Sequence, residues 1–210
     1  YGVVGMLGIF FAIAQTFIDS GFSSALIRKK DCTDADYSTA FYFNLGVGII
    51  SFLILFLSAP YIARFFDTPI LKDVARVLSI NLFINSLTIV QHAKLNAAVD
   101  FKSQAKISLT STLLSGIIGL AMAYSGFGIW SLVFQSVSSA TIRAILLWQI
   151  GRWRPRLTFA RDSFRYLFGF GSKILTASLL HTIYANLTTI IIGKVYTAKD
   201  LGYYSRGESL

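Results

Sequence analysis

Six long apolar runs, separated by short polar segments, dominate the sequence. Each holds roughly 20 or more mostly apolar residues, the length that an α-helix needs to cross a bilayer core of about 30 Å. None of them alternates between apolar and polar positions with the period of two that a membrane β-barrel requires. The pattern predicts an all-α integral membrane bundle, in which each helix satisfies its own backbone groups. The predicted spans are residues 3–27, 39–63, 74–96, 105–125, 127–150 and 172–193.

The basic residues gather at alternate loops between these runs. Twelve of the nineteen Lys and Arg residues lie in or beside the segments 28–38, 97–104 and 151–171. Short cytoplasmic loops carry an excess of Lys and Arg, so we expect these segments in the cytoplasm and the first span running inwards. With 54% apolar and 14% charged residues, the chain lacks the polar surface of a soluble protein. Separate basic clusters without a continuous basic face also argue against a nucleic-acid partner.

The chain divides into three expected parts. They are five membrane helices of an N-terminal bundle at 1–150, a basic amphipathic cytoplasmic loop at 151–171, and at 172–210 the next membrane helix with the start of another. Within the loop, Phe164, Leu167 and Phe168 share one face of a short helix. This pattern predicts a helix lying in the lipid headgroup layer. Membrane anchoring is the simpler interpretation of that helix, and direct contact with a substrate is the alternative.

Polar residues recur on one face of the third predicted span. Steps of four, three, four and four residues keep five side chains within about 80° of one another around the helix. They are Asn81, Asn85, Thr88, His92 and Asn96. Polar groups inside a membrane face the bundle interior or a water-filled cavity. The stripe therefore predicts either a cavity lining or a seam of interhelical hydrogen bonds, worth about 0.6 kcal/mol per pair.

An acidic residue, Asp19, lies inside the first predicted span. An ionised carboxylate near the centre of a membrane helix costs about 2.5–3.5 kcal/mol on insertion scales, so it needs a partner, a proton or access to water. Asp19 is a candidate coupling-ion site. The alternative is a structural role, as a cap or in a salt bridge, which is favoured because Ser20 and Gly21 follow it directly.

Polar residues on the fifth and sixth predicted spans complete the candidates for a substrate cavity. Gln135 and Arg143 lie on the fifth span, and His181 and Asn186 lie on the sixth. Arg143 and His181 are suited to an anionic ligand. Because Arg143 is close to the basic loop at 151–171, its side chain can instead extend to the cytoplasmic headgroups.

Sequence patterns typical of enzymes and metal sites are missing. The sequence has no phosphate-binding glycine loop, a single cysteine, and two histidines on different spans. Membrane-bound transferases usually carry clustered acidic residues or a sizeable extramembrane domain, and neither is present in this sequence. We expect no metal, no cofactor and no catalytic activity.

Several segments, in order along the whole chain, resemble one family of bacterial transporters. The segments are DSGFSSALIRKKDCTDADYSTAFYFNL, APYIARFF, VDFKSQAKISL, GFGIWSLVFQS, WRPRLTF, FGFGSKIL and IGKVYTAKDLGYYSRGESL. They are similar to the polysaccharide exporters and Wzx-type flippases of lipopolysaccharide and colanic-acid biosynthesis. These proteins belong to the multidrug, oligosaccharidyl-lipid and polysaccharide exporter superfamily.

The resemblance implies a transporter of two pseudo-symmetric bundles, each of six or more helices, of which this sequence would supply helices two to seven. It implies alternating access that moves a polyprenyl-diphosphate-linked oligosaccharide across the bacterial inner membrane. The implied partners are membrane lipid, the lipid-linked oligosaccharide and other polysaccharide assembly proteins.

The resemblance also assigns residues. Asp19 and Gly21 match the acidic and glycine positions of an element that recurs in the second helix of the superfamily. Family members hold the diphosphate with arginines in the cavity, for which Arg76, Arg143 and the two histidines are the candidates here. A cation-coupled small-molecule exporter of the same superfamily is the alternative function, with Asp19 carrying its ion. A membrane-embedded glycosyl- or phosphotransferase is a third hypothesis.

Overall fold

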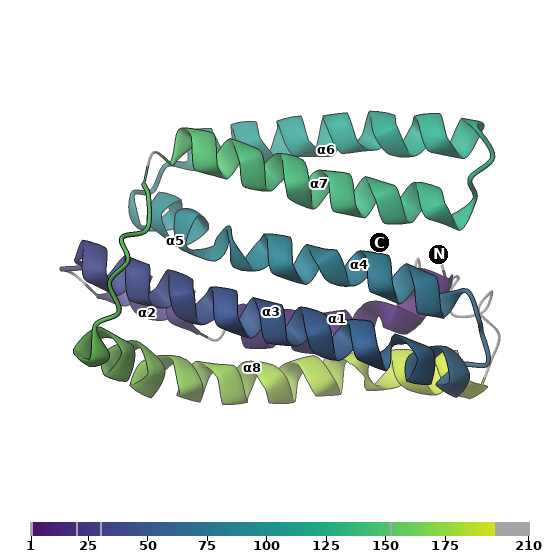
Figure 1. Cartoon of the computed structure of the whole chain (residues 1–210), viewed down its shortest axis with the longest axis horizontal. Coiled ribbons are helices and arrows are strands. Elements are labelled where there is room, and N and C mark those ends of the chain that lie inside the picture. Colours follow the sequence, from purple (N-terminus) through teal and green to yellow (C-terminus); the bar gives the residue numbers. More distant parts are fainter. Residues whose placement is uncertain (1, 20, 30, 152, 196–210) are drawn as a thin grey trace.

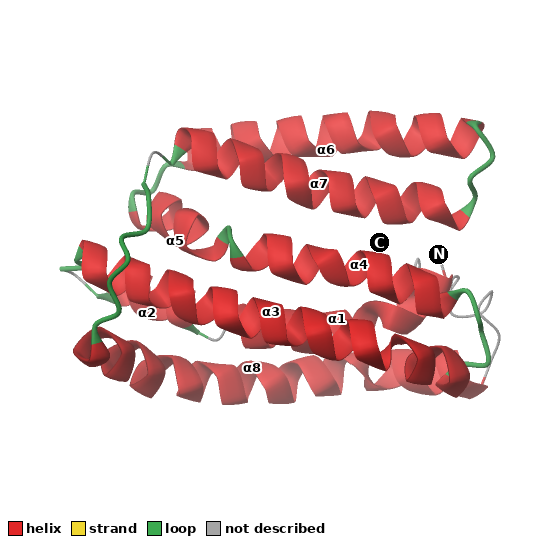
Figure 2. Ribbon diagram, in the orientation of Figure 1, coloured by secondary structure: helices red, strands yellow, loops and turns green. Residues whose placement is uncertain are grey.

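The structure is a computed structural model that describes residues 2–19, 21–29, 31–151 and 153–195. Every regular element in these residues is an α-helix (Figure 2). The helices are α1 (Gly2–Asp19), α2 (Phe22–Arg28), α3 (Asp34–Phe65), α4 (Leu71–Ser86), α5 (Ile89–Ala97), α6 (Phe101–Tyr124), α7 (Ile129–Ile150) and α8 (Arg161–Val195). The segment 196–210 and the basic residues Lys30 and Arg152 lie outside the described residues.

The long helices run roughly along one common direction (Figure 1). In that view α6 and α7 form a hairpin along the upper edge, α8 lies along the lower edge, and α4 with α5 lies between them. α7 packs on α4, α4 packs on α3 and α1, and α1 packs on α8. The α6–α7 hairpin therefore meets the rest of the bundle mainly through α4.

Four stretches of the described chain are long and apolar enough to cross a membrane, and α4 with α5 makes a fifth if the bent pair is one span. They are α1 with α2, α3, α6 and α7. The predicted all-α membrane bundle is confirmed. The sixth predicted span, 172–193, is helical as part of α8, but α8 is not among these five.

The third predicted span is not one continuous helix. It breaks between Ser86 and Ile89, and α4 and α5 meet at an angle of 44°. The Thr88 hydroxyl donates to the Asn85 carbonyl at 2.8 Å, which offers that carbonyl a partner outside the regular helical ladder. The Leu87 carbonyl accepts a hydrogen bond of 3.1 Å from the Trp148 indole of α7. A tertiary contact thus helps to satisfy the backbone at the break.

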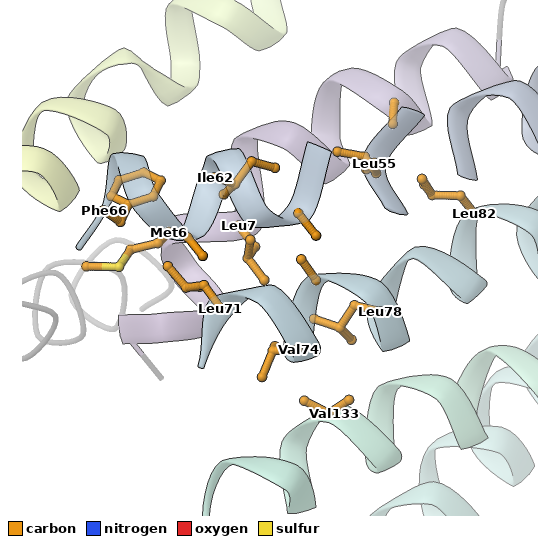
Figure 3. Packing of buried hydrophobic residues seen from close by; sticks show 14 of the residues in the cluster. Met6, Leu7, Leu55, Ile62, Phe66, Leu71, Val74, Leu78, Leu82 and Val133 are labelled. Carbon is orange, nitrogen blue, oxygen red and sulfur yellow. The ribbon is translucent and has the colours of Figure 1, made fainter. Parts of the chain in front are cut away.

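The larger apolar core lies between α1, α3 and α4 and receives Val133 from α7 (Figure 3). Leu7, Leu71 and Val74 are fully buried within it. Lipid tails are as apolar as these side chains, so close packing and dispersion, rather than escape from water, hold a membrane core together.

A second apolar cluster closes the end of the bundle where the predicted cytoplasmic loops lie. There the segment 153–160 crosses the start of α3. Trp153 packs edge-on against Tyr37 and Phe41. The backbone N–H groups of Arg156 and Ala160 donate to the hydroxyls at positions 38 and 39, at 3.1 and 3.0 Å. These contacts fix the connection from α7 to α8.

The amphipathic helix predicted in this loop is not a separate element. Residues 161–168 are the first turns of α8, which continues without interruption to Val195. Leu167 is fully buried, and Phe164 packs against Phe22 and Phe43. The apolar face that the sequence predicts in the headgroup layer is therefore largely covered by protein, and only Phe168 is largely exposed.

Candidate functional site

Three neighbouring cavities open along α1, α4 and α7. The first, of about 370 Å³, lies between α4, α6 and α7, and the second, of about 430 Å³, lies between α1, α4 and α7. The third, of about 340 Å³, lies where α1 and α2 face α5 and α7. Asn85 lines all three, and the three cavities together are called the groove below.

Amide and hydroxyl side chains supply most of the polar lining of the groove. Its polar residues are Gln15, Ser23, Asn81, Asn85, Thr88, Thr112, Ser115, Gln135, Ser136 and Ser139, with the charged or titratable Asp19, His92 and Arg143. Such groups both donate and accept hydrogen bonds, as sugar hydroxyls do. Each cavity falls within the range of about 300–1,000 Å³ that is usual for ligand pockets.

Hydrogen bonds across the groove join the three helices that form it. The Asn81 amide donates to the Ser136 hydroxyl at 2.9 Å and so ties α4 to α7. The Asn85 amide donates to the Gln15 carbonyl oxygen at 3.0 Å and ties α4 to α1. Gln15 in turn donates to the Asp19 carboxylate at 3.2 Å. The carbonyl oxygen of Asn81 is buried and has no hydrogen-bond partner among the described residues.

The charged groups gather at one end of the groove. Asp19, His92 and Arg143 line the same cavity of about 340 Å³, from three different helices. No ion pair joins Asp19 or Arg143 to another side chain in the part of the chain that the structure describes, where the ion pairs present are Lys29–Asp36 and Arg156–Asp34. Opposite charges thus face a shared space without neutralising each other.

Most of the predicted cavity residues meet in the groove. Asn81, Asn85, Thr88 and His92 of the third predicted span line it, together with Gln135, Arg143 and Asp19 from other spans.

Three candidates lie outside these cavities. Asn96 lies beyond the bend, and its amide is 3.4 Å from His92 Nδ1. His181 is exposed on α8, and Asn186 donates to the Thr182 carbonyl within the same helix at 2.8 Å. α8 packs against α1, where Thr182 and Thr16 lie 3.1 Å apart.

The groove also holds polar residues that were not among the predicted site residues, including Gln15 and Ser136. Gln15 lies one helical turn before Asp19, and Ser136 lies about two turns before Arg143, so helical spacing from the predicted candidates was the available signal. Arg76, the other arginine candidate, stacks on Phe56 of α3 at 4.9 Å from the ring centre and does not line the groove. No three His, Cys, Asp or Glu side chains among the described residues gather as a metal site would require.

Comparison with known proteins assigns the chain to a family. All of it, residues 1–210, matches the family described as polysaccharide biosynthesis protein. The chain belongs to this family. The resemblance drawn from the sequence motifs is therefore confirmed, and the apolar helices make the protein a multi-pass bacterial membrane protein.

Known proteins that the chain is similar to are distant in sequence. The teichuronic acid biosynthesis protein TuaB of Bacillus subtilis (strain 168) is 30% identical over 195 residues, which cover 91% of this chain and 40% of that protein. The succinoglycan biosynthesis transport protein ExoT of Rhizobium meliloti (strain 1021) is 26% identical, over 89% of this chain and 38% of its own length. The lipopolysaccharide biosynthesis protein WzxC of Escherichia coli (strain K12) is 22% identical, over 98% and 42%.

This chain spans about 40% of the length of these relatives. No solved structure matches it.

Proposed function

We propose that this protein is part of an exporter that moves a polyprenyl-diphosphate-linked oligosaccharide across the bacterial inner membrane by alternating access. One observation carries the proposal: adjoining cavities lined by amide and hydroxyl groups lie along α1, α4 and α7, in a bundle of apolar helices. Membership of a polysaccharide biosynthesis family supports it, and so does the similarity to ExoT, a succinoglycan biosynthesis transport protein.

The physical reason lies in the hydration of the cargo. A sugar chain crosses hydrocarbon only when other polar groups replace its water, because each unpaired polar group in an apolar medium costs several kcal/mol. Asn81, Asn85 and Gln135 offer donors and acceptors at successive levels of the groove.

The charged end of the groove suits the diphosphate. Arg143 has no carboxylate partner among the described residues, so its guanidinium is free to bind a phosphate with two parallel hydrogen bonds. His92 lies in the same cavity and adds a donor. We assign Asp19, at the other wall of that cavity, to the coupling ion or proton. Neutralising Asp19 would strengthen anion binding at Arg143, because the competing negative charge is removed.

The test replaces groove residues in the full-length protein and measures surface polysaccharide in cells that lack the native gene. Asn85→Leu and Arg143→Leu are expected to reduce export strongly at equal protein level. Matched controls come from the same residue types outside the groove, on α8: Asn186→Leu, whose amide bonds within its own helix, and Arg165→Leu, on the exposed side. Both controls are expected to export normally.

Analysis of lipid-linked intermediates separates the competing functions. In the groove variants, a lipid-linked oligosaccharide is expected to accumulate on the cytoplasmic face. Normal glycolipids together with altered resistance to small toxic compounds would instead support the small-molecule exporter. Equal export by the groove variants and their controls would refute the proposal.

A further inference from the structure

We infer that Gln15 is a positioning residue that links the charge of Asp19 to the group that Asn85 presents to cargo. The inference rests on the proposed function, and its evidence is the chain of hydrogen bonds from Asp19 through Gln15 to Asn85. The two links measure 3.2 and 3.0 Å, and they connect α1 to the centre of the groove on α4.

The direction of this chain follows from the chemistry of its first member. An ionised carboxylate only accepts hydrogen bonds, so Gln15 must turn its amide nitrogen towards Asp19. Its carbonyl oxygen then points towards α4 and only accepts. Asn85 must in turn offer its own amide nitrogen to Gln15, as the structure has it. One negative charge thus fixes the orientation of two amide groups.

The orientation of these amides decides which polar atom Asn85 presents in the groove. With its nitrogen held by Gln15, Asn85 has its carbonyl oxygen left to accept from a sugar hydroxyl. When a proton or a bound cation neutralises Asp19, the carboxyl group no longer demands a donor and both amides are free to reverse. Asn85 then presents a donor where it presented an acceptor. Because Asn85 lines all three cavities, this reversal changes the affinity for cargo at the centre of the groove.

Among the described residues, the hydrogen bonds through Gln15 connect Asp19 to Asn85 directly. The other charged or titratable groups facing its cavity are His92 of α5 and Arg143 of α7, and neither forms an ion pair with it. Thr16, the next residue after Gln15, lies on another face of α1 and contacts Thr182 of α8 at 3.1 Å. Thr16 therefore offers a matched control on the same helix.

A double-mutant cycle in the full-length protein tests the link, with the initial rate of surface polysaccharide appearance as the measurement. Asp19→Asn and Gln15→Leu are each expected to lower export about fivefold or more, and their effects are expected to be non-additive, as for residues of one hydrogen-bond network. The double variant is expected to export at least as fast as the less active of the two single variants, because both substitutions break the same chain of hydrogen bonds. Asp19→Asn combined with Thr16→Val is expected to give the product of the two single effects.

The outcomes distinguish the inference from the function on which it rests. If each of Asp19→Asn and Gln15→Leu lowers export and the double variant shows the product of the two effects, Gln15 does not link Asp19 to Asn85 and the inference is overturned. If neither variant lowers export and Asn85→Leu and Arg143→Leu also export normally, the proposed function itself fails. Equal amounts of folded protein in the membrane, measured for every variant, exclude a loss of folding as the cause.

Discussion

Replacement of Gly21 by alanine tests the packing that positions Asp19. Gly21 has φ of +68°, and a Cβ placed on it would lie 2.6 Å from the Gly171 carbonyl oxygen and 3.0 Å from Ile174 Cβ. The left-handed conformation costs a residue other than glycine about 1–2 kcal/mol. Overlap with backbone atoms of α8, which cannot rotate away, adds about 1–3 kcal/mol. Gly21→Ala is therefore expected to lower the free energy of unfolding by about 2–5 kcal/mol.

The chain supplies a control for each contribution. Gly126 has φ of +82° with nothing within 4 Å of a built Cβ, so Gly126→Ala isolates the backbone cost of about 1–2 kcal/mol. Gly8 lies in α1 with the same open space, so Gly8→Ala is expected to be neutral or to stabilise by up to about 1 kcal/mol. Reversible unfolding of the full-length protein in mixed micelles gives the three values. A Gly21→Ala variant as mild as Gly126→Ala would refute the close approach of α2 and α8.

Two further predictions concern the loops. Val99 holds φ of +54° at the end of α5, so Val99→Gly is expected to stabilise the protein by about 0.5–1 kcal/mol, and a lower midpoint of thermal unfolding would contradict this. Lys29 pairs at 2.7 Å with Asp36, whose side chain is 1% exposed, whereas Arg156 and Asp34 form an exposed pair at 3.4 Å. Lys29→Met is expected to cost about 3–5 kcal/mol and Arg156→Met less than about 1 kcal/mol; equal losses in a denaturant titration would overturn that ranking.

Hydropathy predicted the class of fold and the positions of most helices, but not where they bend or begin. At the break between α4 and α5, the Trp148 indole binds the Leu87 carbonyl from a helix some sixty residues later in the chain. A local pattern carries no information on such a contact. A hydropathy profile likewise misses the start of α8 at Arg161. Helix formation does not require apolar residues, and the profile detects only the apolar part that follows.

Only the part of the candidate site that lies on one helix face could be predicted from the sequence. The polar stripe of the third predicted span placed Asn81 and Asn85 on one face, because helical spacing fixes their direction, and both residues line the groove. It also indicated Asn96, which lies one helical turn beyond His92 and outside the groove. His181 and Asn186 had equal polarity in the sequence, but only the packing of α8 on α1 shows that they lie outside the groove.

The central claim is that the groove carries the sugar. Site-specific photo-crosslinking in living cells tests it most directly, with a photoreactive amino acid at Ser139, which lines the groove, and at Leu113, which is 65% exposed on α6. The sugar is radiolabelled, and the full-length protein is purified after illumination. We predict labelled saccharide attached at position 139 and little at position 113. Equal labelling at both positions, or none at position 139 in a variant that still exports, would contradict the account.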